Sequence, residues 1–201
     1  MNFIEDIASL EALYGTAGGA SILKVTPALT PAYRHWIERS RFCVLSTTGP
    51  AGTDGSPRGD IDPVVKIQDD KTLLLPDWRG NQRLDTLRNI VEDGRISLMF
   101  MVAGSTTVMR VNGTARLTAD DDICGQFEQK TRNPKTVIVI TISEVYPQCA
   151  RAVMRAGLWE TGDMSKGLPS VGDMLKEITA GGFDGAAYDA EWPERAKKSM
   201  W

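Results

Sequence analysis

The sequence predicts a mainly β protein of the α+β class, in which six strands form a small barrel flanked by helices. Six β-prone runs follow one another at close spacing between residues 42 and 143, with turn residues between them. The regular alternation of strands and helices that builds a Rossmann sheet is missing, and neither G-x-G-x-x-G nor a Walker A sequence occurs. We therefore expect a barrel rather than a sandwich or a doubly wound sheet.

The 201 residues have the length of a single domain, which the patterns divide into three parts. Residues 1–40 are predicted to form N-terminal helices, residues 41–160 the barrel core, and residues 161–201 a C-terminal helical tail. Hydrophobic residues make up 42% of the chain, which is enough for a sizeable core.

Two helices are predicted before the barrel. Apolar residues recur at near-helical spacing between residues 4 and 13, and the glycines of residues 15–19 end this element. Thr30 is a suitable N-cap and Pro31 suits the first helical position, so a second helix is expected to run to about Glu38.

The strands are predicted from runs of β-branched, aromatic and other apolar residues. Gly113 lies inside a strand long enough to bend, which indicates a β-bulge or a close approach of another backbone. Residues 49–57 are rich in glycine and proline and are predicted to form a loop. The six predicted strands cover residues 42–47, 61–67, 71–75, 95–102, 106–117 and 136–143.

Further helices are predicted between and after these strands. A helix opens near Arg83, because apolar residues follow it at helical spacing up to residue 91. Ser170 is expected to cap a helix in the tail, and Pro193 is expected to begin a last short helix that ends at Trp201. Two short helices are expected over residues 120–130 and 148–156.

The segment of residues 75–90 is the most informative part of the chain. A short apolar strand stops at Pro76, a turn follows with Gly80, and a helix then begins. The turn gathers guanidinium groups, side-chain amides and the free N–H groups of a helix start, which together suit a phosphate group. A cation such as Arg83 in the first helical turn opposes the helix dipole unless an anion is present. The alternative is a solvated, well-capped helix start without a ligand.

Charge and hydropathy exclude several other classes. The net charge is −3 and the pI about 5.3, which argues against a nucleic-acid partner. No apolar run reaches the length of a membrane span, and residues 1–6 lack the basic start of a signal peptide. We therefore expect a cytoplasmic protein without a membrane partner.

The cysteines and the single histidine carry no recognisable catalytic or metal-binding pattern. The three cysteines are far apart and odd in number, which is typical of reduced thiols, and Cys43 and Cys149 are predicted to pack in the core. His35 alone cannot complete a His/Cys zinc site, and no nucleophile signature surrounds it. No metal is expected, and no catalytic residue is assigned.

Four stretches in this order resemble one family. They are residues 56–60 (Ser-Pro-Arg-Gly-Asp), residues 75–90, residues 106–115, and residues 146–152 followed by Leu158-Trp159. The chain resembles the FMN-binding split barrel of the pyridoxamine 5′-phosphate oxidase-related proteins over about residues 30–159. This resemblance implies a split β-barrel and a homodimer with FMN in a groove between two barrels.

The resemblance also implies a set of cofactor-binding residues. The segment around Asn81, Gln82 and Arg83 matches the family's phosphate-holding turn, and Arg58 matches a basic position that faces the phosphate and the isoalloxazine edge. Thr107 and Arg110 fall on a later strand that lines the groove. Trp78 either stacks on the flavin or covers the barrel. The full set is Arg58, Trp78, Arg79, Asn81, Gln82, Arg83, Thr107 and Arg110.

The implied activity is FMN-dependent oxidation or reduction of a small molecule that the sequence leaves unidentified. The Arg-x-His pattern with which the family's vitamin B6 oxidases hold their substrate is missing from the C-terminus, so vitamin B6 is not the expected substrate. Two alternatives stay open, namely a non-enzymatic module that binds or senses a flavin or another anionic cofactor, and a deazaflavin in place of FMN. The apolar tail either walls the open flavin face or thickens the dimer interface.

Overall fold

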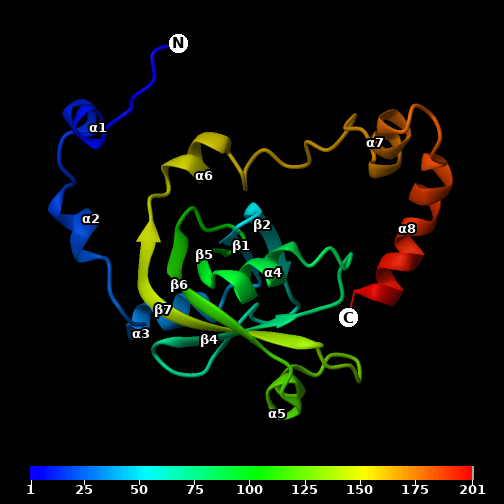
Figure 1. The fold of residues 1–201 in the computed structure, drawn as a ribbon, viewed down its shortest axis with the longest axis horizontal. Coiled ribbons are helices and arrows are strands. Elements are labelled where there is room, and N and C mark those ends of the chain that lie inside the picture. The colour runs from blue at the N-terminus through cyan, green and yellow to red at the C-terminus, as the bar shows by residue number, and fades with distance from the viewer. Residues whose placement is uncertain (201) are drawn as a thin grey trace.

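The computed structural model describes residues 1–200, in which seven strands form one antiparallel sheet that curls into a split barrel (Figure 1). The strand order is β2-β1-β5-β6-β7-β4-β3, so β2 and the β4–β3 pair lie at the two ends of the sheet. This confirms the predicted fold class. The strands are β1 (Phe42–Gly49), β2 (Gly52–Gly59), β3 (Lys66–Ile67), β4 (Thr72–Asp77), β5 (Arg95–Met101), β6 (Val108–Thr118) and β7 (Thr136–Gln148).

The seventh strand is β2, and the prediction of a loop over residues 49–57 was wrong. Residues 52–59 pair with β1 in a tight hairpin, with Gly49 opposite Gly52. β2 is an edge strand with β1 as its neighbour, and an edge tolerates glycine and Pro57 because half of its backbone groups need no partner strand. The predicted strand over residues 61–67 shrinks to β3, since Pro63 interrupts the run.

Gly113 forms the predicted bulge. The register between β6 and β7 shifts between Asn112 and Gly113. A Cβ atom at Gly113 would lie 2.0 Å from the carbonyl oxygen of Thr141 and 3.0 Å from its carbonyl carbon. Only glycine allows this close approach, because both atoms belong to the backbone of the facing strand.

The core fills the barrel interior. Alternate residues of β1, β5, β6 and β7 are buried there, and Phe100, Leu98, Leu45 and Val111 are among the fully buried side chains. A smaller apolar cluster on the other side of β4 and β7 joins Leu74, Val137 and Cys124. The second apolar face of β7 is therefore covered by the chain's own residues 121–127 rather than left for a partner.

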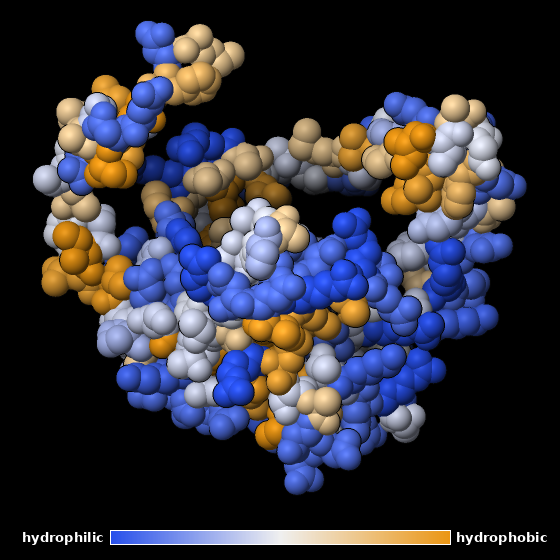
Figure 2. All heavy atoms as spheres, viewed as in Figure 1, coloured by the Kyte–Doolittle hydropathy of each residue, from blue (hydrophilic) through white to orange (hydrophobic). Residues whose placement is uncertain are grey.

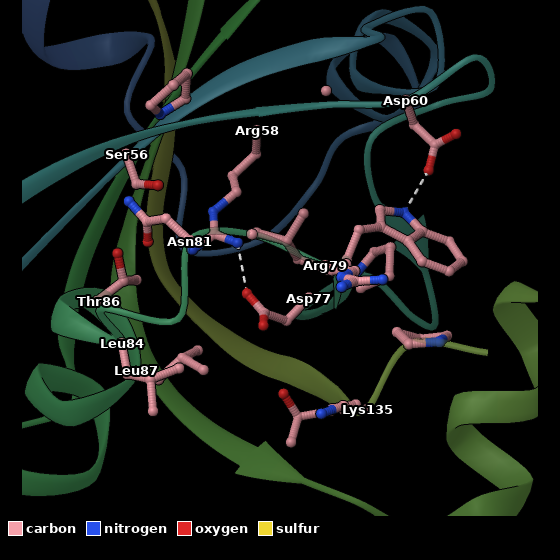
Figure 3. A pocket seen from close by; sticks show the side chains of 18 of the residues that line it. Ser56, Arg58, Asp60, Asp77, Arg79, Asn81, Leu84, Thr86, Leu87 and Lys135 are labelled. Atoms are coloured by element: carbon pink, nitrogen blue, oxygen red, sulfur yellow. Dashed lines mark hydrogen bonds and ion pairs between the residues drawn. The ribbon is translucent and has the colours of Figure 1, made fainter. Parts of the chain in front are cut away.

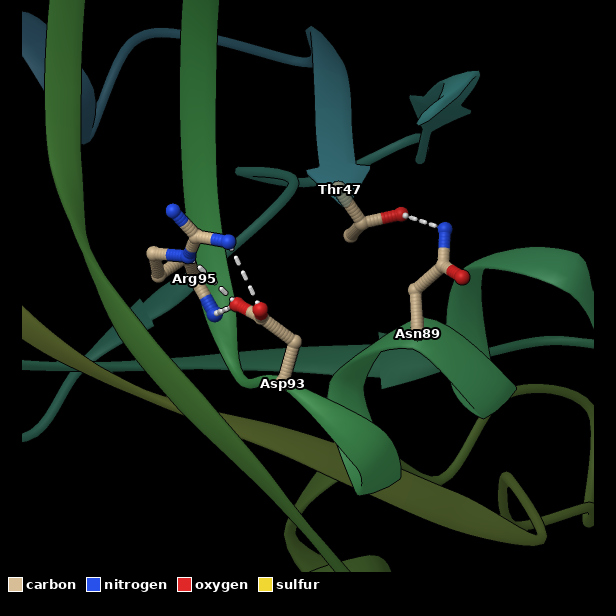
Figure 4. Close-up of polar contacts among 4 residues, drawn as sticks. All are labelled: Thr47, Asn89, Asp93 and Arg95. Atoms are coloured by element: carbon tan, nitrogen blue, oxygen red, sulfur yellow. Dashed lines mark hydrogen bonds and ion pairs between the residues drawn. The ribbon is translucent and has the colours of Figure 1, made fainter. Parts of the chain in front are cut away.

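Helix α4 (Asp85–Glu92) covers one end of the barrel and is tied to the β1–β2 hairpin. Asn89 donates a hydrogen bond to Thr47 Oγ1 at 3.1 Å (Figure 4), and Thr86 Oγ1 donates to Asp54 on β2. Ile90 packs into the core. These contacts fix α4 beside the β1–β2 hairpin and the start of β2, which positions the site described below.

The remaining helices are α1 (Ile7–Tyr14), α2 (Gly19–Leu23), α3 (Pro31–Ile37), α5 (Asp121–Cys124), a 3-10 turn η1 (Gly125–Phe127), α6 (Arg151–Ala156), α7 (Val171–Ile178) and α8 (Gly185–Ser199). Thr30 and Ser170 cap α3 and α7 as predicted. The prediction that Pro193 begins the last helix was wrong: Asp184 caps α8, and Pro193 lies inside it. Trp201, the predicted end, lies outside the described residues. The predicted helix over residues 120–130 is reduced to α5 and η1.

Two helical arms project from the barrel (Figure 1). No residue of α1 or α2 is buried. Helices α7 and α8 pack on each other, and Asp189 of α8 accepts hydrogen bonds from the Ser170 hydroxyl and from the Gly172 backbone N–H. Apolar side chains gather on both arms (Figure 2), which include Leu13, Leu23 and Val171 among their exposed residues. No helix among residues 1–200 has the length and apolarity needed to cross a membrane.

Two of the thiols differ in their surroundings. Cys43 is fully buried, and this burial raises the pKa of its thiol to about 12, although the nearby Arg58 charge lowers it. Cys43 is therefore a core residue and not a nucleophile. The prediction that Cys149 packs in the core was wrong, because Cys149 follows the last residue of β7 and is exposed.

Candidate functional site

A cavity of about 1660 Å³ opens at the split of the barrel, between the end of β2 and the segment that connects β4 to α4. The loop of residues 132–135 and the first residue of β7, Thr136, form a third wall. Six of the eight predicted site residues line this cavity: Arg58, Trp78, Arg79, Asn81, Gln82 and Arg83. Figure 3 labels Arg58, Arg79 and Asn81 among them.

The cavity exists because β2 and β4 belong to opposite parts of the sheet and do not pair with each other. A side-chain ion pair spans the gap between them instead. Nη1 of Arg58, on β2, lies 2.5 Å from Oδ1 of Asp77, at the end of β4 (Figure 3). The two side chains are only 16% and 19% exposed. The pair is thus a mostly buried link between β2 and β4 across the split of the barrel.

Two buried polar atoms beside this pair have no hydrogen-bond partner within residues 1–200. They are Nε of Arg58 and Oγ1 of Thr136, and both residues line the cavity. Thr136 faces Asp77 across the β4–β7 ladder, so the two atoms belong to one small region. A buried donor without an acceptor is costly, and a ligand with an oxygen or nitrogen acceptor would satisfy Arg58 here.

The turn before α4 has an unusual backbone. Gln82 and Leu84 have φ values of 61° and 64°, in the left-handed region that non-glycine residues seldom adopt. Asn81 Oδ1 accepts a hydrogen bond from the backbone N–H of Arg83 at 3.1 Å, so Asn81 shapes the turn. Strained backbone of this kind concentrates at ligand-binding segments. The turn holds the side chains of residues 79–83 along the cavity rim.

Arg83 does not lie in the first turn of a helix, so the dipole argument for it was wrong. The helix begins at Asp85, two residues later, and Arg83 Nε lies 2.9 Å from Asp85 Oδ2. The acidic residue, rather than a ligand, occupies the favourable first-turn position. Arg83 remains on the rim with a side chain that is 75% exposed.

Two other cations border the cavity. Arg79 and Lys135 are exposed, and neither forms an ion pair or hydrogen bond with any residue of the described chain. Their charges are therefore not neutralised by a neighbouring carboxylate, in contrast with the charge of Arg58. An anionic group of a ligand would meet these two cations and Arg83 at the rim.

Trp78 forms part of the wall rather than the interior. Its Nε1 donates to Asp60 Oδ2 at 2.8 Å (Figure 3), and the side chain is half-buried. Trp78 and Asp60 also border a second, smaller cavity of about 410 Å³ on the other side. The Trp78–Asp60 pair thus separates two hollows of the surface.

Thr107 and Arg110 do not reach this cavity. Arg110 lies on the outer face of β6, with its guanidinium 5.5 Å from the centre of the Tyr146 ring, and the backbone N–H of Thr107 donates to Ser105 Oγ. Strands β1 and β5 lie between β6 and β2 in the sheet, so one subunit keeps these two residues apart from the other six.

Among residues 161–200, the C-terminal tail lines the cavity at Met200 alone. Met200 lines the rim, and Nη1 of Arg132 donates to the Lys198 carbonyl at 3.5 Å. Val171, Met174, Ile178 and Trp192 are exposed large apolar residues of the tail, and none of them lines the cavity.

The sequence prediction missed several residues of the site. Asp77 adjoins the predicted turn and was within reach of the same argument, since a carboxylate beside basic residues is a common partner. Lys135 and Thr136 could not be predicted from the sequence, because only the pairing of β7 with β4 brings them to the cavity. No cluster of three or more histidine, cysteine or acidic residues that could hold a metal occurs within residues 1–200.

Comparison with protein families gives one match. Residues 29–149, more than half of the chain, match the family described as pyridoxamine 5′-phosphate oxidase. The matched region begins before α3 and ends just after β7, so it contains the whole barrel and all walls of the cavity up to residue 136. A comparison with curated protein sequences gave no match.

Several solved structures are similar. HupZ from Group A Streptococcus has a TM-score of 0.49 and 19% identity, over 59% of this chain and 93% of that one. A protein from Lactobacillus delbrueckii, provisionally named a pyridoxamine 5′-phosphate oxidase, has a TM-score of 0.48 and 24% identity, over 60% and 95%. A protein from Syntrophomonas wolfei, described as FMN-binding, has a TM-score of 0.43 and 16% identity, over 71% and 97%. These values support no functional argument.

Proposed function

The chain belongs to the pyridoxamine 5′-phosphate oxidase family, and from this premise we propose that it is a flavoprotein that binds FMN in the cavity at the barrel split. The observation that carries the proposal is the chemistry of the cavity. It combines buried, unsatisfied hydrogen-bonding atoms at Arg58 and Thr136 with cations at the rim. A flavin mononucleotide needs both, because its ring edge carries carbonyl acceptors and its other end carries a phosphate.

The residues present fit the parts of FMN. Arg79, Asn81, Gln82, Arg83 and Lys135 would hold the phosphate at the rim, where the N–H groups of the α4 start lie nearby. Apolar lining residues would cover the rings, and these are Pro57, Ile61, Val64, Leu75, Leu84 and Leu87.

The bound flavin would supply hydride or electron transfer, and the chain would supply binding and orientation. We propose an oxidoreductase, either an oxidase or a reductase, that acts on a small molecule. The family's vitamin B6 substrate is not part of this proposal, because no Arg-x-His sequence occurs in the 201 residues. Met200 at the rim would help to wall the flavin from one side.

Purified protein is expected to be yellow and to release one flavin per subunit on denaturation. Mass spectrometry of the denatured supernatant would identify the cofactor and separate FMN from a deazaflavin. A colourless protein that also fails to bind added FMN would overturn the proposal. If FMN binds but the reduced flavin passes electrons to no acceptor, dioxygen included, the protein is a binding or sensing module instead of an enzyme.

We further propose a homodimer. The outer face of the sheet exposes Phe42 (40%) and Met99 (38%), and Val44, two residues after Phe42 on β1, is the direct partner of Met99 on β5. Arg110 belongs to the same face, since it pairs with Met99. A two-fold interface on this face would bury apolar surface and would place Arg110 at the boundary between the subunits.

Sedimentation at micromolar concentration is expected to give a particle of twice the 22.0 kDa chain mass. Replacing Met99 with Glu should shift the particle towards the monomer, because it places a charge in the middle of the buried patch. Glutamate at Val91, which is 73% exposed on α4, serves as the control and should leave the dimer intact. A 22.0 kDa particle for the unmodified chain would contradict the dimer.

A further inference from the structure

The Arg58–Asp77 pair differs electrostatically from three cations at the rim of the cavity, Arg79, Arg83 and Lys135. Arg58 is mostly buried and its charge is compensated at 2.5 Å by Asp77. Arg79 and Lys135 are exposed and lack such a partner among the described residues, and Arg83 and its partner Asp85 are 75% and 45% exposed. The floor of the cavity is therefore close to neutral, while the rim carries the available positive charge.

The pair with Asp77 leaves the Nε–H of Arg58 without an acceptor in the described part of the chain and so available to a ligand. Asp77 holds Nη1, and Nε stays buried without an acceptor within residues 1–200. A guanidinium that is held by one nitrogen cannot rotate freely, so Asp77 determines where Nε points. The neighbouring Thr136 hydroxyl adds a group that can donate or accept.

We propose that Asp77 is a positioning residue that sets the charge selectivity of the cavity. It orients Arg58 to donate to a neutral acceptor, such as a ring carbonyl, and it keeps the phosphate of the ligand away from the floor. The phosphate then lies at the rim with Arg79, Arg83 and Lys135. This inference rests on the proposed flavin binding.

The physical reason is the cost of placing two anions together in a partly buried site. A phosphate at Arg58 would lie within a few ångströms of the Asp77 carboxylate, and repulsion between them is weakly screened where water is excluded. A neutral carbonyl meets no such repulsion and still gains a charge-assisted hydrogen bond. The neutral pair at the floor and the free cations at the rim thus favour one orientation of a ligand with one anionic end.

The test compares FMN and riboflavin, which differ only in the phosphate. In Asp77→Asn, the amide oxygen still accepts from Arg58, but the negative charge is gone. Affinity for FMN relative to riboflavin, measured by quenching of flavin fluorescence, is expected to rise by about three- to tenfold, while riboflavin affinity changes by less than about twofold. An unchanged ratio would overturn the inference.

A matched control removes a carboxylate from an arginine pair outside the cavity. Asp93 accepts from Arg95 Nε at 2.7 Å and from Nη2 at 2.8 Å (Figure 4), and neither residue lines the cavity. Asp93→Asn should leave the FMN-to-riboflavin ratio at the value of the unmodified protein. Asp77→Glu keeps the negative charge and should also leave the FMN-to-riboflavin ratio unchanged. If the ratio in Asp77→Glu rises as it does in Asp77→Asn, the charge of Asp77 is not what sets the selectivity.

A second variant locates the phosphate even if Asp77→Asn proves unstable. The double variant Arg58→Gln with Asp77→Asn removes both charges and keeps the floor neutral. We expect FMN and riboflavin to lose affinity by the same factor, since the lost contact is to the common ring. A larger loss for FMN would place the phosphate at Arg58 and overturn the inference. If the unmodified protein binds neither flavin, the proposed function itself fails.

Discussion

Replacing both Arg79 and Arg83 with glutamate is expected to weaken FMN binding by about 100-fold, with riboflavin affinity changed by less than about threefold. The two guanidinium groups lie on one turn at the cavity rim, where the phosphate is proposed to bind. A charge-assisted hydrogen bond contributes roughly 1.5–3 kcal/mol, and we use the lower value because Arg83 is 75% exposed. Two such losses correspond to about two orders of magnitude in the dissociation constant.

The matched control makes the same change of charge away from the cavity. Arg88 and Arg116 are exposed on α4 and β6, and neither lines the cavity. Glutamate at both positions should change FMN affinity by less than about threefold at physiological ionic strength, because distant surface charges are screened. If the Arg79 and Arg83 variant loses FMN and riboflavin equally, the phosphate site lies elsewhere.

Replacing Gly113 with alanine is expected to lower the free energy of unfolding by about 3 kcal/mol. The added Cβ would lie 2.0 Å from the Thr141 carbonyl oxygen, and a backbone atom in the β6–β7 ladder cannot move aside as a side chain can. Overpacking in a well-ordered core usually costs about 1–3 kcal/mol, and the upper end applies where backbone is displaced. Urea denaturation followed by circular dichroism measures the change.

Gly55 provides the control for this substitution. It also lies in a strand, β2, but a Cβ atom there has no neighbour within 4 Å and φ is not in the left-handed region. Alanine at Gly55 should change the unfolding free energy by less than about 1 kcal/mol. A Gly113 variant as stable as the Gly55 variant would show that the bulge relaxes more easily than the close contact suggests.

Features that depend on neighbours in the sequence were predicted well. The caps at Thr30 and Ser170 are local, because a side-chain oxygen bonds to a backbone N–H three residues later. The bulge at Gly113 follows from a glycine within a long strand. The turn at residues 78–83 was placed correctly beside the site, although the helix start was misplaced by two residues and the dipole argument for Arg83 failed with it.

Features that depend on the tertiary structure were missed or misread. Residues 52–59 have weak strand propensity and form a strand because β1 offers an edge to pair with. The second apolar face of β7 is covered by Cys124 and its neighbours in the smaller cluster, which only the packing of residues 121–127 against the sheet reveals. Pro193 was predicted to begin the last helix, but α8 starts at Gly185, where Asp184 is the N-cap, and Pro193 lies inside the helix.

The sequence by itself determined the fold class, because strand periodicity, turns and caps are set by residues close together in the chain. Its resemblance to one family implied six of the residues that line the cavity. Only the tertiary structure decided the electrostatics of that cavity. Arg58 and Asp77 come from β2 and β4, which do not pair with each other. Their side chains meet because the sheet curls and brings these two strands close together. A charge pair between distant segments has no local signature, so its neutralising effect on Arg58 appears only once the barrel is formed.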